Sequence, residues 1–190
     1  MSERGLLAFD ETWGKELRHK SPSITDDEFE TPWDDYYDII HFVKTAPLLD
    51  VFATHQNSKC TWELTKTENA FTTDWLLPDG TVGDVWVNHP HSDHPRALWR
   101  AENQYRKFNM NITMIIPTNV GRTHYWHDII EPNRFKRYNL NGHIDLELYW
   151  KTIRFLKDGK PSKDSSRNAY FILVWRKKGT NAIKGNEGIS

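Results

Sequence analysis

The chain has 190 residues, 37% of them hydrophobic, and a formal net charge of −1 at pH 7. This length suffices for one well-packed domain and is short for two. No apolar stretch approaches membrane-spanning length, residues 1–20 lack the apolar core of a signal peptide, and the single cysteine, Cys60, excludes an internal disulfide. We therefore expect a cytoplasmic protein, in the host cell cytoplasm if it is viral, with no membrane partner.

Helix and strand signals alternate along most of the chain. Residues 1–25 have the composition of a polar N-terminal arm, residues 26–178 that of one domain, and residues 179–190 that of a flexible tail. In chain order the patterns predict a helix at 34–44, strands at 47–54, 60–64 and 83–88, a helix at 95–108, a strand at 111–117, a helix at 118–130, and two strands joined by a basic loop within 150–178. This order predicts an α/β fold with a mostly parallel sheet and an antiparallel C-terminal hairpin.

The charge is divided unevenly between the two ends of the chain. Residues 1–50 hold five Lys or Arg against twelve Asp or Glu, whereas residues 134–190 hold thirteen against five. A basic end of this kind is compatible with a polyanion-binding face. It is equally compatible with an ordinary solvated surface, so charge alone leaves both interpretations open.

Two polar residues, Asp50 and Asn88, each fall at the end of a predicted strand. Ligands of open α/β sheets bind outside the carboxyl ends of the strands. We therefore expect Asp50 and Asn88 to line one crevice.

The stretch `NHPHSDH` at residues 88–94 supports two kinds of chemistry. His89, His91, Asp93 and His94 match the His-x-His-x-Asp-His loop of the metallo-β-lactamase superfamily, in which imidazoles and a carboxylate hold zinc for hydrolysis. The further ligands of that superfamily are widely separated, whereas the remaining candidates here crowd between residues 124 and 145. A zinc hydrolase is therefore one alternative function for this stretch.

The same stretch read as Asn88-His89-Pro90-His91 is similar to the Asp/Asn-Pro-Pro-aromatic turn of amino-group methyltransferases. The nitrogen lone pair of an adenine amino group is delocalised into the ring, so this amino group is a poor nucleophile. An Asn oxygen and the next backbone carbonyl accept its two N–H groups, and this concentrates electron density on the nitrogen. A rigid proline then places a ring that stacks on the base, which must be flipped out of the DNA helix. No metal is needed.

Several other blocks extend this similarity along the chain. In order they are `DDEFETPWDDYYDIIHF`, `LLDVFATHQNSKC`, `TTDW`, `VWVNHPHS`, `MNITMIIPTNVGRTHYWHDII` and `IRFLKDGKPSKDSSRNAYFILVW`. Their order and spacing over residues 26–176 resemble the phage-type DNA adenine-N6 methyltransferases (Dam-like). The resemblance implies a Rossmann-like, S-adenosylmethionine-dependent methyltransferase domain at residues 26–178. It also implies methyl transfer from S-adenosylmethionine to the N6 amino group of adenine in DNA.

The resemblance also implies site residues. The cofactor contacts are Thr31, Pro32, Asp50, Phe52, Ala53, Asn57 and Asp74. The catalytic turn is Asn88, His89, Pro90 and His91. The DNA contacts are Lys157, Lys160, Lys163 and Arg167 on the basic hairpin loop.

Two residues depart from the family pattern. His89 replaces the usual first proline, although its backbone carbonyl is retained, and His91 replaces the usual tyrosine or phenylalanine. An imidazole stacks with less area and gains a charge when it is protonated. A DNA-binding relative with weakened catalysis is therefore a second alternative.

Overall fold

The computed structural model of the chain describes residues 29–119, 123–131, 136–138, 144–157, 159–161 and 168–179. The predicted arm at residues 1–25 and residues 180–190 of the predicted tail lie outside these ranges. The helices are α2 (Trp33–Val43), the short 3-10 helix η2 (His91–Asp93), α3 (His94–Phe108) and α4 (His124–Ile129). The strands are β1 (Pro47–Asp50), β2 (Trp62–Glu63), β3 (Asp84–Val87), β4 (Ile112–Pro117), β5 (Lys136–Tyr138), β6 (Ile144–Ile153), β7 (Leu156–Lys157), β8 (Lys160–Pro161) and β9 (Asn168–Trp175).

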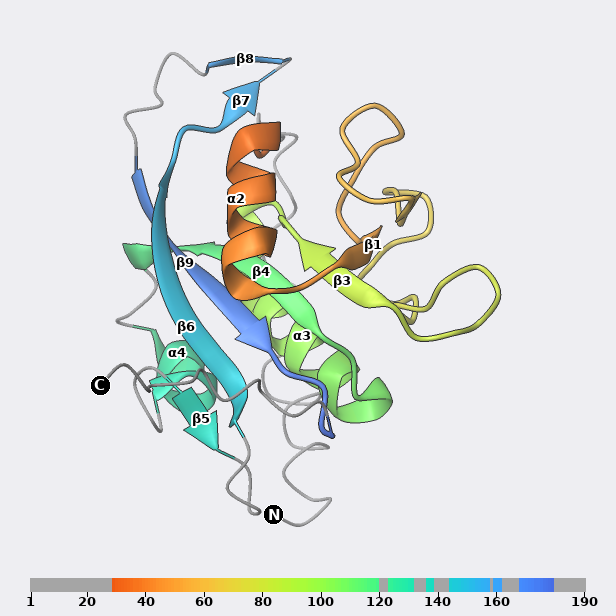
Figure 1. Cartoon of the computed structure of the whole chain (residues 1–190), viewed down its shortest axis with the longest axis vertical. Helices are drawn as coiled ribbons and strands as arrows, with labels where there is room; N and C mark the ends of the chain where they lie inside the picture. Colours follow the sequence, from red (N-terminus) through yellow and green to blue (C-terminus); the bar gives the residue numbers. More distant parts are fainter. Residues whose placement is uncertain are drawn as a thin grey trace, which may run out of the picture.

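A seven-stranded sheet in the order β2-β1-β3-β4-β9-β6-β5 forms the centre of the domain (Figure 1). Strands β1 to β4 are joined by parallel pairs, whereas β9 runs antiparallel between β4 and β6, and β5 runs antiparallel to β6. Five of the seven strands therefore point the same way. The predicted α/β class, mostly parallel sheet and antiparallel C-terminal strand pair are confirmed.

Hydrophobic side chains cover both faces of this sheet. Val85 and Val87 of β3 belong to the core that includes α3 and α4, whereas Trp86 between them belongs to the core that includes α2. This alternation follows from the two-residue period of a strand. Figure 1 shows α2 on one face and α3 and α4 on the other. Among the described residues, no helix is long and apolar enough to cross a membrane.

Some predicted elements differ in length from those observed. Of the predicted helix at 118–130, the described residues form a 3-10 turn at 118–119 and the α-helix α4, which begins after Thr123. The predicted strand at 60–64 has only two residues, and the first hairpin strand begins at Ile144 rather than near residue 150. Charged residues concealed that earlier start, because the buried Glu147 accepts hydrogen bonds from Arg176 instead of being apolar.

A short segment, Phe29–Thr31, precedes α2 and is hydrogen-bonded to the C-terminal half of the chain. The Glu30 amide donates to the Leu156 carbonyl at 2.8 Å, and the Leu156 amide donates back to Glu30 at 2.9 Å. This antiparallel bridge ties the segment to β7. Pro32 then forms the N-cap of α2 without a side-chain cap.

Candidate functional site

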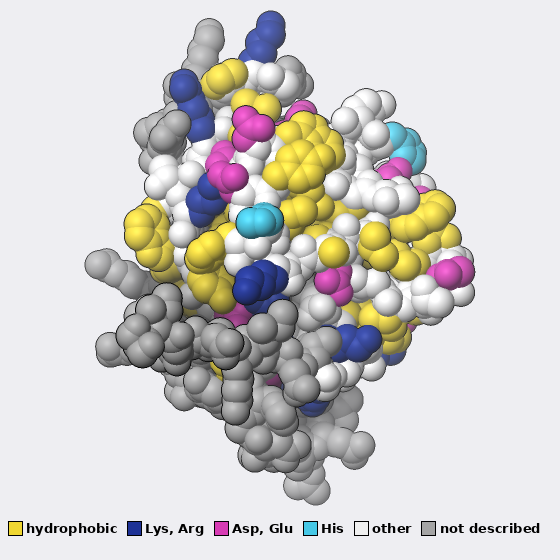
Figure 2. Space-filling view, viewed as in Figure 1, with side chains coloured by type: hydrophobic (Ala, Val, Ile, Leu, Met, Phe, Trp, Pro, Cys, Tyr) yellow, Lys and Arg dark blue, Asp and Glu magenta, His cyan; other side chains and the backbone are white. Residues whose placement is uncertain are grey.

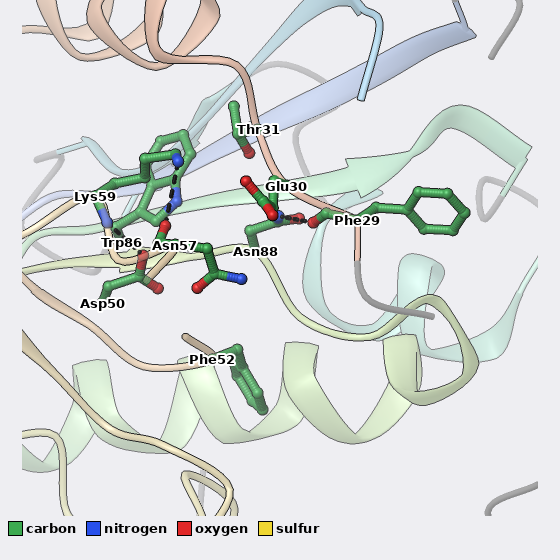
Figure 3. Close-up of a pocket in the computed structure, with 9 residues that line it drawn as sticks. All are labelled: Phe29, Glu30, Thr31, Asp50, Phe52, Asn57, Lys59, Trp86 and Asn88. Carbon is green, nitrogen blue, oxygen red and sulfur yellow. Dashed lines mark hydrogen bonds between the residues drawn. The ribbon is translucent and has the colours of Figure 1, made fainter. Parts of the chain in front are cut away.

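A pocket lies at the carboxyl ends of β1 and β3, where ligands of parallel sheets bind. Its empty space is about 240 Å³ and is partly open to solvent. The lining residues are Phe29, Glu30, Thr31, Asp50, Phe52, Asn57, Lys59, Trp86 and Asn88 (Figure 3). The prediction that Asp50 and Asn88 share one crevice is therefore confirmed.

The pocket gathers four of the seven residues that the resemblance implied as cofactor contacts, and one of the four in the implied catalytic turn. These are Thr31, Asp50, Phe52, Asn57 and Asn88. Four further lining residues, Phe29, Glu30, Lys59 and Trp86, were not predicted. Lys59 is the only one with a sequence signal, since it is a cation two residues after Asn57 in the loop that follows Asp50.

Three other implied cofactor contacts are not among the lining residues. Pro32 caps α2, and Ala53 is buried with its amide bonded to the Leu64 carbonyl at 3.3 Å. Asp74 lies in a separate polar cluster, in which the Lys107 ammonium donates to it at 2.7 Å and holds its pKa below the usual range. The roles of these three residues stay predictions.

Asp50 is the buried acid of the pocket. Its Oδ2 accepts the Lys59 backbone N–H at 3.0 Å, whereas its Oδ1 has no hydrogen-bond partner among the described residues. Burial raises the pKa of Asp50 from 3.8 to about 6, although hydrogen bonds from the Lys59 and Phe52 backbone act in the opposite direction. The free oxygen of a buried carboxylate is a strong acceptor for a cationic ligand group.

Two further buried polar atoms of the lining residues lack partners within the described part of the chain, Thr31 Oγ1 and Trp86 Nε1. Buried polar atoms in folded proteins are nearly always hydrogen-bonded, so each exception requires an explanation. Asp50, Thr31 and Trp86 come from three different parts of the chain and line one pocket. A polar ligand bound there would supply partners for these atoms.

Lys59 supplies the positive charge of the pocket. Its Nζ donates to the Asn57 carbonyl at 3.1 Å and lies 4.4 Å from the centre of the Trp33 ring. Burial lowers the pKa of Lys59, whereas the charges of Glu30 and Asp50 act to raise it. Among the described carboxylates none forms an ion pair with Lys59, so its ammonium is suited to bind an anionic ligand group.

Asn88 has a defined amide orientation. Its Nδ2 donates to the Phe29 carbonyl at 2.8 Å, and because a carbonyl only accepts, the amide nitrogen must face Phe29 (Figure 3). Its Oδ1 then remains as an acceptor in the pocket lining. The two residues meet only because β7 holds the Phe29–Thr31 segment beside the end of β3.

The other residues of the turn lie beside the pocket. His89 is buried, and its Nε2 and the Nδ1 of His94 are 2.6 Å apart. Burial, with smaller effects from His94 and His91, holds the pKa of His89 well below its usual range, so its imidazole is neutral. Pro90 precedes η2, and the His91 ring stacks on the Phe29 ring with centroids 5.3 Å apart.

The interpretation of residues 88–94 as a zinc site finds no support in the geometry. Across the residues that the structure describes, no three His, Cys, Asp or Glu side chains are placed to hold a metal ion. His89 and His94 instead bond to each other.

Two of the implied DNA contacts lie on the β7–β8 hairpin, and the other two, Lys163 and Arg167, lie outside the described residues. Lys157 is half-buried and Lys160 is exposed. Figure 2 shows basic side chains at the top of the view, where Figure 1 places this hairpin. Through the bridge between Leu156 and Glu30, the hairpin is bonded directly to the pocket wall.

A polar pocket at the ends of parallel strands lies where α/β proteins bind their ligands. A family model described as DNA N-6-adenine-methyltransferase (Dam) matches residues 18–183, and the chain belongs to this family. Comparison with curated proteins and with solved structures found no match. The protein transfers a methyl group to the N6 amino group of adenine in DNA, and S-adenosylmethionine is its methyl donor. Neither the zinc-hydrolase nor the weakened-relative alternative is favoured.

Proposed function

We propose that the pocket binds the amino-acid and sulfonium end of S-adenosylmethionine, and that Asn88 holds the adenine amino group beside it. The observation that carries this proposal is that three buried polar atoms without partners among the described residues belong to residues lining the same pocket as the oriented amide of Asn88. The pocket is partly open to solvent, and the space of about 240 Å³ between its lining residues includes part of that opening.

The charges of the pocket fit an α-amino acid group. The free Oδ1 of Asp50 accepts from the cofactor ammonium, and the Lys59 ammonium donates to the cofactor carboxylate. Thr31 and Trp86 contribute one hydroxyl and one N–H that have no partner in the part of the chain that the structure describes. Phe52 and Asn57 complete the wall. Pro32, Ala53 and Asp74 do not line the pocket, and they stay predicted cofactor contacts.

Asn88 prepares the nucleophile. Its Oδ1 accepts one N6–H while Phe29 holds its other end, and the His89 carbonyl accepts the second N6–H. Pro90 keeps the turn rigid, and His91, itself backed by Phe29, stacks on the flipped base. S-adenosylmethionine supplies the methyl group: the N6 lone pair forms the new N–C bond as the S–C bond breaks and its electron pair returns to sulfur, and N6 then releases one proton to water.

The residues that we assign to the methyltransferase domain, 26–178, include both this pocket and the basic hairpin. We assign the Rossmann-like fold of S-adenosylmethionine-dependent enzymes to this domain, and we place its activity in the cytoplasm. Lys157, Lys160, Lys163 and Arg167 contact the phosphates of DNA.

The cofactor assignment is tested by calorimetric titration of chelator-treated protein with S-adenosylhomocysteine. We expect binding at micromolar strength, roughly −8 kcal/mol. Absence of binding, together with tight binding of zinc, would reject the assignment.

Lys59→Gln should weaken the binding of S-adenosylmethionine and S-adenosylhomocysteine to the same extent, because both ligands carry the same carboxylate. Loss of one charge-assisted hydrogen bond predicts a decrease of roughly tenfold in both affinities. Lys44→Gln, at the far end of α2, removes the same charge from an exposed position and is the matched control. Unchanged affinity in Lys59→Gln would show that Lys59 does not contact the cofactor.

Lys160→Gln should weaken DNA binding without changing cofactor affinity. Removing one phosphate contact reduces the slope of log K against log salt by about one. The measurement is a salt titration of duplex binding by fluorescence anisotropy, with Lys44→Gln again as the control. Equal salt slopes for Lys160→Gln and the unmodified protein would remove the hairpin from the DNA interface.

A further inference from the structure

The pocket contains one acid more than an α-amino acid group requires. Its charged side chains are Glu30, Asp50 and Lys59, two carboxylates and one ammonium. This end of S-adenosylmethionine carries the opposite charges: two cations, the sulfonium and the ammonium, and one carboxylate. If Asp50 and Lys59 take the amino-acid group, the carboxylate of Glu30 and the sulfonium remain as the complementary pair.

The backbone fixes where Glu30 lies. Both of its backbone polar groups are bonded to Leu156, and the carbonyl of the preceding residue, Phe29, holds the Asn88 amide. Glu30 is therefore the acid of the pocket that is tied most directly to Asn88, whereas Asp50 is bonded to the Lys59 loop. Reacting atoms approach to roughly 3–3.5 Å in a productive complex, so the sulfonium must lie close to Asn88.

The Glu30 side chain is half-buried. With the described residues it forms neither an ion pair nor a side-chain hydrogen bond. Methyl transfer converts the sulfonium into a neutral thioether, so any attraction between this charge and a nearby carboxylate is lost in the product. At partly solvated sites such an attraction corresponds to roughly tenfold in affinity.

We propose that Glu30 is a specificity-determining residue that faces the sulfonium and makes the pocket prefer S-adenosylmethionine over S-adenosylhomocysteine. The inference rests on the proposed function, since it requires that this pocket hold the cofactor. Its consequence is that the product, S-adenosylhomocysteine, binds less tightly than S-adenosylmethionine and leaves the site.

The test is calorimetric titration of the unmodified protein and of Glu30→Gln with three ligands: S-adenosylmethionine, S-adenosylhomocysteine and sinefungin. In sinefungin a carbon atom that carries an amino group replaces the sulfur and its methyl, so the ligand keeps a positive charge without a transferable methyl. Glu30→Gln preserves the side-chain length and the backbone bridge. Asp34→Asn, an exposed acid in the first turn of α2, removes the same charge outside the pocket and is the control.

We expect Glu30→Gln to lower the affinity for the two cationic ligands by roughly tenfold and to leave that for S-adenosylhomocysteine within about twofold. Asp34→Asn should change none of the three. Equal losses for all three ligands, or no loss, would overturn the role of Glu30 while leaving the cofactor pocket intact. Failure of the unmodified protein to bind any of them would instead overturn the proposed function itself.

Discussion

Asn88→Ala is expected to lower methyl transfer by at least about 100-fold while the affinity for S-adenosylhomocysteine stays within a few-fold of the original. The variant removes the acceptor that we assign to the adenine amino group. Loss of one group that acts on the reacting atoms lowers turnover by about 10²- to 10³-fold. The measurement pairs single-turnover methylation of an adenine-containing duplex with calorimetry, and equal losses of transfer and of cofactor affinity would contradict the proposed role.

Asn88→Asp distinguishes two roles of this side chain: its oxygen as an acceptor, and its hydrogen bond to Phe29, which orients that oxygen. The aspartate keeps an oxygen toward the pocket but cannot donate to the Phe29 carbonyl, which accepts the Asn88 Nδ2–H at 2.8 Å. A carboxylate facing a carbonyl oxygen is unfavourable, so the side chain should turn away from its position. We expect turnover between that of the unmodified protein and that of Asn88→Ala. Full activity would show that the hydrogen bond to Phe29 has no positioning role.

Asp50→Asn is expected to weaken cofactor binding by roughly 100-fold, because it removes the buried charge that we assign to the cofactor ammonium. The same substitution should stabilise the folded protein at neutral pH. Burial raises the pKa of Asp50 from 3.8 to about 6, which means that the ionised carboxylate opposes folding. A shift of this size corresponds to at most about 3 kcal/mol. A gain in stability with a loss of binding is the signature of a site residue.

The pH dependence of stability follows from the direction of this shift. The folded state binds the Asp50 proton more tightly than the unfolded state does, so this group makes stability fall as pH rises from 3.8 to about 6. Asp50→Asn should therefore match the original protein near pH 4 and exceed it above pH 6. Urea unfolding across this range measures the difference. Asp79→Asn, an exposed loop acid, should show no such gain at neutral pH.

Cofactor binding should show the opposite pH dependence. Because the ammonium binds the ionised form of Asp50, affinity should fall as the pH drops below about 6 in the original protein. Calorimetry in buffers of different ionisation enthalpy would detect the linked proton release. A flat affinity profile between pH 5 and 7 would contradict the pairing of Asp50 with the cofactor ammonium.

The order of helices and strands could be read from local patterns, because each depends on neighbouring residues. The two-residue alternation around Trp86 and the helical spacing of Tyr36, Ile39 and Val43 report which sides are buried. The position of Asp50 and Asn88 at adjacent strand ends follows from the same patterns, since parallel strands end at one edge. Boundaries were less accurate where buried charged residues such as Glu147 interrupt the apolar pattern.

The composition of the pocket depends on contacts between residues far apart in the chain. Pairing of Glu30 with Leu156 places Phe29 and Glu30 against Asn88, and no local pattern encodes this bridge. Long-range packing likewise decides what surrounds each carboxylate. Asp50 lies in the pocket with one oxygen that has no partner among the described residues, whereas Asp74 accepts a hydrogen bond from Lys107. The residue types in the chain could thus indicate methyl transfer to an amino group, and they could indicate the strand ends at which the site lies. Only folding, which exchanges water for specific distant partners, selects which polar atoms remain available to a ligand.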